Sequence, residues 1–243
     1  MACRFGMQFK AVIFDVDGTL ADTEQYGHLP ACNEAFRLMG LPIQWNWPYF
    51  KELMKTVQGN ANRLCNELKK NFDFTEEQTK SIAREFTLLK KQLYINKYLP
   101  GLALRQGVLE FVNYLRNAGI RMAIVSTSYE DQINALLKNQ LIEHGSYFNP
   151  VLGKESGQKT GEDGILYSRC LEQLGLPSDQ CLVIEDSEVG LKAALKAGIP
   201  TIITYNDYTE GEDFTGATWV VSSLAELNFQ HVMNGEFQRN ITD

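Results

Sequence analysis

The stretch Phe14-Asp15-Val16-Asp17-Gly18-Thr19-Leu20 places two aspartates directly after an apolar run that begins at Phe9. This run is short and mostly apolar, which predicts a buried strand of a parallel sheet. Side chains two positions apart in an extended segment point to the same side, so Asp15 and Asp17 can face one site. Ligands of open α/β sheets bind at the carboxyl ends of the strands, and this pair of aspartates lies at such an end.

A cation is needed where two carboxylates lie this close, because they repel each other, and their hard oxygen atoms favour Mg²⁺. Gly18 lets the backbone approach a ligand closely, and Thr19 adds a hydroxyl group. A simple turn is the competing interpretation, because Asp-Gly is common turn chemistry after a strand. Asp15 and Asp17 alone do not separate the two interpretations, so the rest of the chain has to test them.

The composition is that of an ordinary globular protein. The 243 residues are 44% hydrophobic and 22% charged, and they suffice for one large domain or two modest ones. The formal charge of −7 argues against a surface for nucleic acid or anionic membrane, which needs clustered lysine and arginine. The five cysteines are scattered and lack Cys-x-x-Cys spacing, which predicts reduced thiols in a cytoplasmic protein rather than a zinc site or disulfides. We expect no signal peptide, no membrane span, and a monomer that acts on a small molecule.

The periodicity of apolar residues changes twice along the chain. After Leu20 it becomes helical and stays so to about Tyr98, with a capping box at residues 75–78. From about Gly107 onward, helical and strand patterns alternate, which predicts a parallel sheet covered on both faces. Besides the first strand, we expect strands at residues 121–125, 147–152, 181–184, 201–204 and 219–221.

This order of patterns predicts one α/β domain that is interrupted after its first strand by a helical insert. Residues 1–21 and 101–243 would form a Rossmann-like three-layer core with a parallel sheet, and residues 22–100 would form an all-helical domain. An insert that follows the carboxyl end of a strand starts beside the predicted site, so it can act as a lid.

Polar residues follow two later strands, as Asp15 follows the first. Ser126 ends one of them, where its hydroxyl and the next N–H could hold a phosphate oxygen, although a helix cap is the competing interpretation. Glu185 and Asp186 end another, where an acidic helix N-terminus is the competing interpretation. Two acids in a sheet that already holds an aspartate pair fit a metal site better. Asp15, Asp186 and the backbone carbonyl of Asp17 would then be Mg²⁺ ligands.

Positive charge has to offset this acidic cluster, and the loop between residues 153 and 164 supplies Lys154 and Lys159. The run Gly157-Gln158-Lys159-Thr160 is a near match to a phosphate-binding loop. Because Gln158 replaces its second glycine, we reject an ATP-binding interpretation. A solvated loop lysine is the ordinary interpretation. We favour Lys159 as the group that neutralises a phosphate, because it precedes a helix after a predicted strand, and Lys154 remains the alternative.

Taken in order, these pieces resemble the four motifs of the haloacid dehalogenase-like (HAD) phosphohydrolase superfamily. The motifs are Asp-x-Asp at residues 15–17, Ser126 after a later strand, Lys159, and the pair Glu185-Asp186. The resemblance covers nearly the whole chain. It is strongest to the branch that contains β-phosphoglucomutase and the rubisco-associated xylulose bisphosphate phosphatase. The runs that carry it are 21–24 (ADTE), 57–63 (VQGNANR), 125–128 (VSTS), 183–191 (VIEDSEVGL) and 208–214 (YTEGEDF).

The resemblance implies a Mg²⁺-dependent phosphatase of small phosphorylated sugars, such as a sugar bisphosphate, that works through an aspartyl-phosphate. The insert is similar to the C1-type cap of the superfamily. By this resemblance Asp15 would be the nucleophile and Asp17 the general acid and base, while Ser126 and Lys159 would stabilise the transferring phosphoryl group. The implied magnesium ligands are Asp15, Asp17, Glu185 and Asp186. The implied substrate-binding residues are Gly18, Thr19, Thr23, His28, Arg63 and Thr127.

Two positions depart from the family pattern. Gly27 occupies the place of the histidine expected after Asp-Thr-Glu, with His28 next to it, and Lys159 lacks the usual Lys-Pro-x-Pro context. A sugar-phosphate mutase of the β-phosphoglucomutase type stays open as an alternative, in which the phosphoryl group returns to a sugar rather than to water. A catalytically silent HAD-like binding protein is the third interpretation, although a scaffold needs no such acidic cluster.

Overall fold

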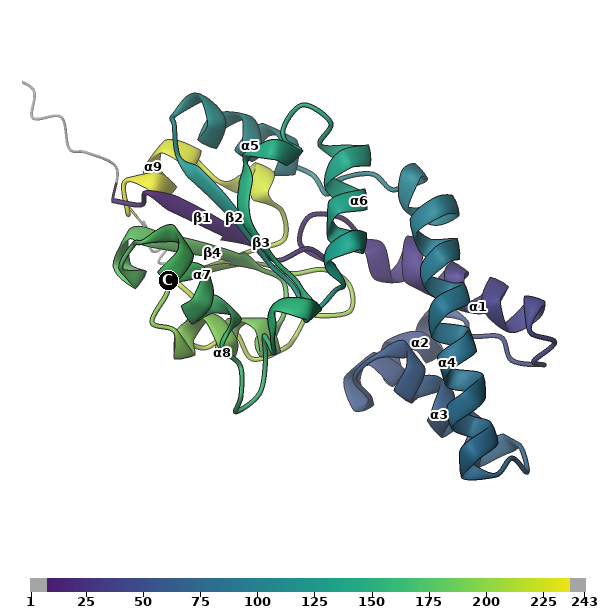
Figure 1. The fold of residues 1–243 in the computed structure, drawn as a ribbon. Helices are drawn as coiled ribbons and strands as arrows, with labels where there is room; N and C mark the ends of the chain where they lie inside the picture. Colours follow the sequence, from purple (N-terminus) through teal and green to yellow (C-terminus); the bar gives the residue numbers. More distant parts are fainter. Residues whose placement is uncertain (1–7, 237–243) are drawn as a thin grey trace, which may run out of the picture. The chain divides into compact units, whose positions relative to one another are not determined.

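Six parallel strands form one sheet within residues 8–236, the part of the chain that the computed structural model describes (Figure 1). Their order is β3-β2-β1-β4-β5-β6, and they run Ala11–Phe14 (β1), Arg121–Val125 (β2), Phe148–Leu152 (β3), Cys181–Glu185 (β4), Thr201–Thr204 (β5) and Trp219–Val221 (β6). This is the order of a doubly wound Rossmann-type sheet, whose ligand crevice lies where the order reverses, between β1 and β4. The predicted α/β fold is therefore confirmed.

Strand β1 lies at the centre of this sheet and pairs with β2 on one side and β4 on the other. Phe14 is level with Ile124 of β2 and with Ile184 of β4. The residues that follow these three strands therefore reach the same edge of the sheet. All four residues of β1 are buried, which explains the apolar run in the sequence, because a strand covered on both faces has no polar side.

Helices cover both faces of the sheet and complete the three layers (Figure 1). They are α5 (Val108–Asn117), α6 (Glu130–Gln140), α7 (Leu166–Leu174), α8 (Glu188–Lys196) and α9 (Phe229–Met233). Ile13 belongs to an apolar cluster with residues of α7 and α8. The next residue, Phe14, contacts Phe111 of α5 at 6.0 Å between ring centroids. Successive side chains of β1 thus fill two opposite cores, as the alternation of a strand requires.

The chain divides into two compact units, one formed by Asp22–Leu102 and the other by the segments on either side of it. The Asp22–Leu102 unit holds α1 (Leu29–Leu38), α2 (Trp47–Thr56), α3 (Asn60–Asn71), α4 (Glu76–Leu93) and the π-helical segments Glu24–His28 and Tyr94–Tyr98. Its apolar core contains the aromatic side chains of Phe36, Trp45, Phe50 and Phe86. The expected capping box begins α4, because Thr75 Oγ1 accepts from the Gln78 N–H at 3.2 Å and Gln78 Oε1 accepts from the Thr75 N–H at 2.9 Å.

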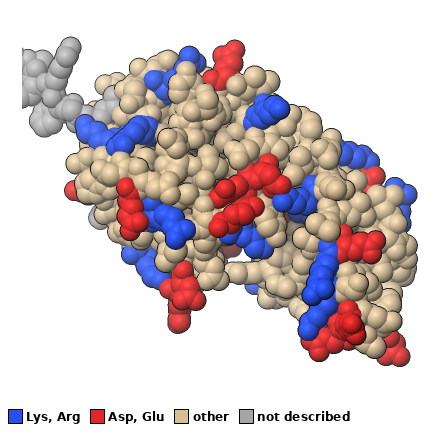
Figure 2. Space-filling model, in the orientation of Figure 1, with Lys and Arg blue, Asp and Glu red and all other residues tan. Residues whose placement is uncertain are grey.

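The charged side chains are dispersed over the face of the molecule that Figure 2 shows. Lysine and arginine are scattered among acidic residues there rather than gathered in one patch (Figure 2). This face therefore lacks the continuous basic surface that nucleic-acid binding needs. Among the helices of residues 8–236, none combines the length and the apolar character required to cross a membrane.

Gly107, which precedes α5, provides a test of the packing of the sheet unit. Its φ is +83°, and a Cβ there would lie 2.2 Å from the backbone nitrogen of Ala225, whereas Gly119 has φ +70° and open space around it. We expect Gly107→Ala to lower the free energy of unfolding by about 2–5 kcal/mol, because left-handed strain adds to overpacking. Gly119→Ala should cost only about 1–2 kcal/mol, from the strain alone. Urea denaturation of both variants measures the difference, and equal losses would contradict this account of Gly107.

Candidate active site

Three buried carboxylates meet where β1 and β4 end. Asp15 directly follows β1, Glu185 is the last residue of β4, and Asp186 follows it. One carboxylate oxygen from each of the three lies within 4.8 Å of the other two. Each residue is at most 5% exposed. The structure therefore brings three of the four predicted metal ligands together.

The side chain of Lys159 enters this cluster from the loop between β3 and α7. Its Nζ lies 2.5 Å from Oδ1 of Asp15 and 2.5 Å from Oε1 of Glu185, and the residue is buried. Lys154 instead lies beside Tyr129, with 4.8 Å between its Nζ and the centre of the ring. Lys159, rather than Lys154, is thus the lysine that the fold delivers to Asp15.

Burial makes the charges of this cluster costly. It raises the pKa of Asp15 from 3.8 to about 7, while Lys159 lowers that pKa and Glu185 and Asp17 raise it. Burial also raises the pKa of Asp186 well above its usual value, and Asp15 and Glu185 add to this effect. For Lys159, burial lowers the pKa, but the carboxylates of Asp15 and Glu185 raise it above its usual value. The single positive charge of Lys159 does not balance the charge of three ionised carboxylates.

The donor set of this cluster fits a divalent cation. Three carboxylates provide hard oxygen ligands, and a cation would offset the negative charge that exceeds the charge of Lys159. The carboxylate of Asp17 is not part of the group of oxygen atoms within 4.8 Å. A role of Asp17 as a ligand through its backbone carbonyl therefore stays a prediction.

The carboxylate of Asp17 is bound by the loop that follows β2. Ser128 Oγ donates to Asp17 Oδ2 at 2.5 Å, and Ser126 Oγ accepts from the backbone N–H of Ser128 at 3.0 Å. Ser126 is fully buried, whereas Thr127 is exposed. Sequence reasoning does not select Ser128, and the run Ser-Thr-Ser after β2 is the signal that could have found it.

Asp186 is held by two side chains from the loop after β5. Asn206 Nδ2 donates to Asp186 Oδ2 at 2.8 Å, and Tyr208 Oη donates to the same oxygen at 3.1 Å. Asn206 Nδ2 also lies 3.3 Å from the carbonyl oxygen of Gly18. Sequence reasoning assigns neither side chain a role. Tyr208 lies in a family-like run, but Asn206 belongs to no motif, and its place after a strand end is its only signal.

Glycine is the residue type that fits position 18, in the turn after β1. Its φ is +81°, and a Cβ there would lie 2.0 Å from Tyr208 Oη and 2.2 Å from Asp186 Oδ2. The neighbouring Thr19 is fully buried, and its hydroxyl has no hydrogen-bond partner among the described residues. Close approach to the acidic cluster therefore explains the glycine that the sequence places after Asp-x-Asp.

His28 lies in a buried group of side chains within the Asp22–Leu102 unit. Its ring stacks on Tyr94 with 4.1 Å between centroids, and its Nδ1 lies 2.7 Å from Nζ of the buried Lys90. A Cβ on Gly27 would lie 2.7 Å from the Tyr94 ring, so a larger residue does not fit there without movement. Sequence reasoning misses Lys90, because its helix has the pattern of an ordinary charged amphipathic helix.

Arg63 and Thr23, the other predicted substrate-binding residues of this unit, are also buried. Arg63 Nε donates to the carbonyl of Val57 at 2.8 Å, and Nη1 donates to Oδ1 of Asn60 at 2.7 Å. Burial lowers the pKa of Arg63, and the carboxylate of Glu24 raises it. Oε2 of Glu24 is buried without a hydrogen-bond partner in the described part of the chain. A buried acceptor without a partner calls for an explanation, and a bound ligand would provide one.

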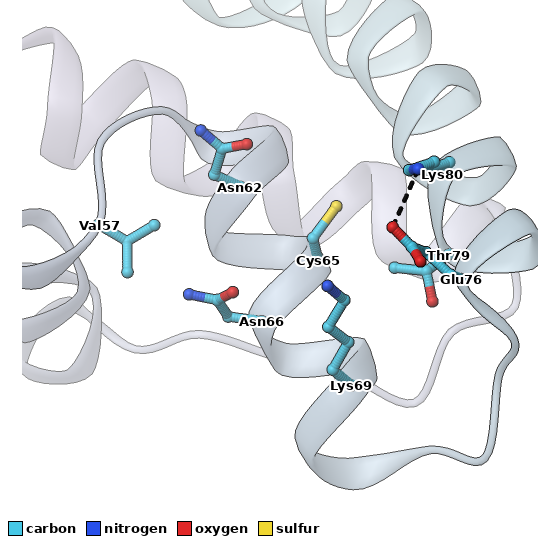
Figure 3. A pocket seen from close by; sticks show the side chains of 8 residues that line it. All are labelled: Val57, Asn62, Cys65, Asn66, Lys69, Glu76, Thr79 and Lys80. Carbon is cyan, nitrogen blue, oxygen red and sulfur yellow. Dashed lines mark ion pairs between the residues drawn. The ribbon is translucent and has the colours of Figure 1, made fainter.

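A hollow of about 350 Å³ lies between α3 and α4 of the same unit (Figure 3). It is lined by Val57, Asn62, Cys65, Asn66, Lys69, Glu76, Thr79 and Lys80. Glu76 and Lys80 form an exposed ion pair at 2.9 Å across one turn of α4. None of the predicted site residues lines this hollow, so the candidate site remains the acidic cluster at the edge of the sheet.

The cluster brings together Asp15, Lys159, Glu185 and Asp186, the residues that resemble motifs of the haloacid dehalogenase-like hydrolases. The model of that hydrolase family matches residues 9–198, and the chain belongs to this family. Among its relatives is the protein CbbY of Rhodobacter capsulatus, with 34% identity over 229 residues that cover 93% of this chain and 98% of that protein.

Solved structures agree with this assignment. The crystal structure of CbbY from Rhodobacter sphaeroides in complex with phosphate matches with a TM-score of 0.76 and 29% identity, over 90% of this chain and 96% of that one. A variant of the same protein in complex with xylulose-1,5-bisphosphate matches equally well. The β-phosphoglucomutase of Clostridium difficile shares the fold, with a TM-score of 0.70 at 20% identity over 93% of this chain and 96% of that one.

The raised pKa of Asp15 predicts how the stability of the metal-free protein depends on pH. The pKa is 3.8 unfolded and about 7 folded, so between these values the folded state holds a proton that the unfolded state has lost. The stability that this protonation contributes is complete below pH 3.8 and is lost as the pH rises through about 7. We therefore expect the free energy of unfolding, measured with urea in the presence of EDTA, to fall across this window.

Two variants separate Asp15 from the other titrating groups. Asp15→Asn should make the fall between pH 4 and pH 7 shallower, because its side chain does not titrate. Asp213→Asn is the matched control, because hydrogen bonds to Thr215 lower the pKa of Asp213 and move its titration below this window. The assignment to Asp15 would be wrong if both variants kept the slope of the wild type.

Proposed function

We propose that the protein is a Mg²⁺-dependent phosphatase of small phosphorylated sugars. The observation that carries the proposal is the buried contact of Lys159 with Asp15 and Glu185 beside Asp186, in a chain of this hydrolase family. Two relatives support the substrate class. CbbY of Rhodobacter sphaeroides was solved with xylulose-1,5-bisphosphate, and a Thermotoga maritima relative at 27% identity over 79% of this chain is named a phosphorylated carbohydrates phosphatase.

The proposed metal ligands are Asp15, Glu185, Asp186 and the backbone carbonyl of Asp17. Bound there, Mg²⁺ would supply charge neutralisation, so that an anionic carboxylate and an anionic phosphate can approach each other. Lys159 supplies positive charge on the same cluster, because its Nζ contacts both Asp15 and Glu185. The lysine and a cation bound by these ligands would thus share the task of holding an anionic phosphate at this edge.

In the first chemical step, a carboxylate oxygen of Asp15 forms a bond to phosphorus, and the bond from phosphorus to the sugar oxygen breaks. Asp17 donates a proton to that leaving oxygen. In the second step, Asp17 accepts a proton from water, the water oxygen attacks phosphorus, and the aspartyl-phosphate bond breaks to give inorganic phosphate and free Asp15. Ser128 orients Asp17 for both transfers, because its hydroxyl is bound to Oδ2 of that carboxylate.

The transferring phosphoryl group would be held by the residues around this pair. Lys159, Ser126 and Thr127 would stabilise its oxygen atoms, as charge develops there in the transition state. We assign the remaining substrate contacts to Gly18, Thr19, Thr23, His28 and Arg63, and we propose that the Asp22–Leu102 unit acts as the cap. The unsatisfied carboxylate oxygen of Glu24 supports a substrate that carries hydroxyl groups.

A phosphate-release screen of the purified protein tests this function. We expect release from sugar phosphates in the presence of Mg²⁺ and none with EDTA, over a panel of pentulose bisphosphates, hexose phosphates and phosphoglycolate. Formation of an isomeric hexose phosphate in place of inorganic phosphate would favour a mutase. A lack of turnover that extends to p-nitrophenyl phosphate and acetyl phosphate would contradict any phosphatase and favour a binding protein.

Substitution of the two aspartates separates their roles. Asp15→Asn should abolish turnover, because the amide cannot form the aspartyl-phosphate. Asp17→Asn should retain Mg²⁺ binding through its backbone carbonyl while turnover falls by about 10²–10⁴-fold. Steady-state kinetics with calorimetric Mg²⁺ binding measures both effects. Near-normal activity of Asp15→Asn would exclude the covalent route, and weak Mg²⁺ binding with normal saturated turnover in Asp17→Asn would exclude its acid–base role.

A further inference from the structure

The guanidinium group of Arg105 binds backbone carbonyls from three separate segments of the sheet unit. Nη1 donates to the carbonyl of Gly18 and, at 2.7 Å, to that of Thr204. Nη2 donates to the carbonyl of Tyr205 at 2.6 Å and to that of Ser222 at 3.1 Å. The backbone N–H of Arg105 also donates to the carbonyl of Leu20 at 2.8 Å. One side chain therefore connects the turn after β1 with the segments that follow β5 and β6.

Two of these segments hold the acidic cluster. Gly18 belongs to the turn that carries Asp15, and Tyr205 directly precedes Asn206, whose amide donates to Asp186 at 2.8 Å. The same amide lies 3.3 Å from the carbonyl of Gly18, the carbonyl that Arg105 also binds. A continuous chain of polar contacts thus leads from Arg105 to the carboxylate of Asp186.

The arginine side chain suits this position for two physical reasons. Its planar fork carries several donors at fixed angles, so it can hold carbonyls of different segments at once, which a single ammonium group on a flexible stem cannot do as rigidly. Its charge is permanent and faces carbonyl dipoles, and hydrogen bonds from charged donors are stronger than neutral ones. Loss of Arg105 would remove one link between the turn after β1 and the loop after β5, which are also joined by the contact of Asn206 with Gly18.

We propose that Arg105 is a positioning residue that sets the affinity of the acidic cluster for its divalent cation, acting through Gly18 and Asn206. The inference rests on the proposed function, because it requires that Asp15, Glu185 and Asp186 bind Mg²⁺. Residues that orient metal ligands from behind typically change metal affinity by about 10–100-fold when they are replaced. The hydrogen bonds of the Arg105 guanidinium described above go to backbone carbonyls, so the proposed route to the cluster runs through Gly18 and through the segment that holds Asn206.

Calorimetric titration of the full chain with Mg²⁺ tests this proposal directly, without an assay of activity. We expect Arg105→Met to raise the Kd for Mg²⁺ by about 10–100-fold, and Arg105→Lys to have a smaller effect because it keeps the charge but loses the fork. Arg121→Met is the matched control. Arg121 Nη1 also binds a backbone carbonyl, that of Leu174 at 2.6 Å. However, Arg121 is the first residue of β2, so it lies at the end of the strand away from the acidic cluster. Its replacement should leave the Kd unchanged.

A double substitution tests the route through Asn206. If Arg105 acts through this residue, Asn206→Ala combined with Arg105→Lys should bind Mg²⁺ no more weakly than the weaker of the two single variants. Fold-changes that multiply in the double variant would overturn the route, and so would an unchanged Kd in both Arg105 variants. A wild-type chain that binds no Mg²⁺ would overturn the proposed metal site together with this inference, whereas normal wild-type binding with unaffected variants would overturn the inference alone.

Discussion

Three acids and one lysine share a buried space at the edge of the sheet, and the surrounding loops are arranged around that charge. Removing an ionised group from water costs several kcal/mol unless charges and hydrogen bonds replace the lost hydration. Each carboxylate of the cluster accordingly has a partner from a different segment. Lys159 contacts Asp15, Tyr167 donates to Glu185 at 2.8 Å, and the loop after β5 donates to Asp186. The partners are sufficient to hold the acids in place, but not to neutralise them.

Strands and loops contribute differently to the site, because strands place residues and loops supply their hydrogen-bond partners. Parallel pairing of β1 with β2 and β4 brings the ends of these strands level. The backbone position of a residue at such an end is therefore fixed by the sheet. Side chains from the loops then orient that side chain through hydrogen bonds. Asp17 illustrates the point, because its place after β1 puts it near the site, while the hydroxyl of Ser128 holds its carboxylate. Two carboxylates in one turn thereby acquire different surroundings, which is the condition for different chemical roles.

The residues that could be predicted from the sequence are those whose position follows from local pattern. Asp15, Ser126 and Asp186 each end an apolar run, and the alternation of helices and strands determines that such ends meet. Arg105 and Asn206 could not be found in this way. The hydrogen bond between Arg105 and Gly18 joins positions 87 apart in the sequence, and the periodicity of apolar residues does not predict such a long-range contact. Lys159 and Lys154 are an intermediate case. The sequence predicts that one lysine of this loop is used, but only the path of the folded loop shows that it is Lys159.

The central strand of the sheet is also the first to leave the ribosome. Strand β1 pairs with β2 and β4, both of which follow the whole Asp22–Leu102 segment, so β1 has no strand partner until much more of the chain has been made. Helices make contacts that are local in sequence and form quickly, whereas parallel strand pairs must close long loops. During synthesis the helical segment can therefore acquire structure first. Meanwhile the nascent β1 remains an apolar stretch whose backbone groups are unpaired. Until β2 and β4 emerge, β1 therefore has the exposed apolar surface and unpaired edges that make incomplete folds prone to aggregation.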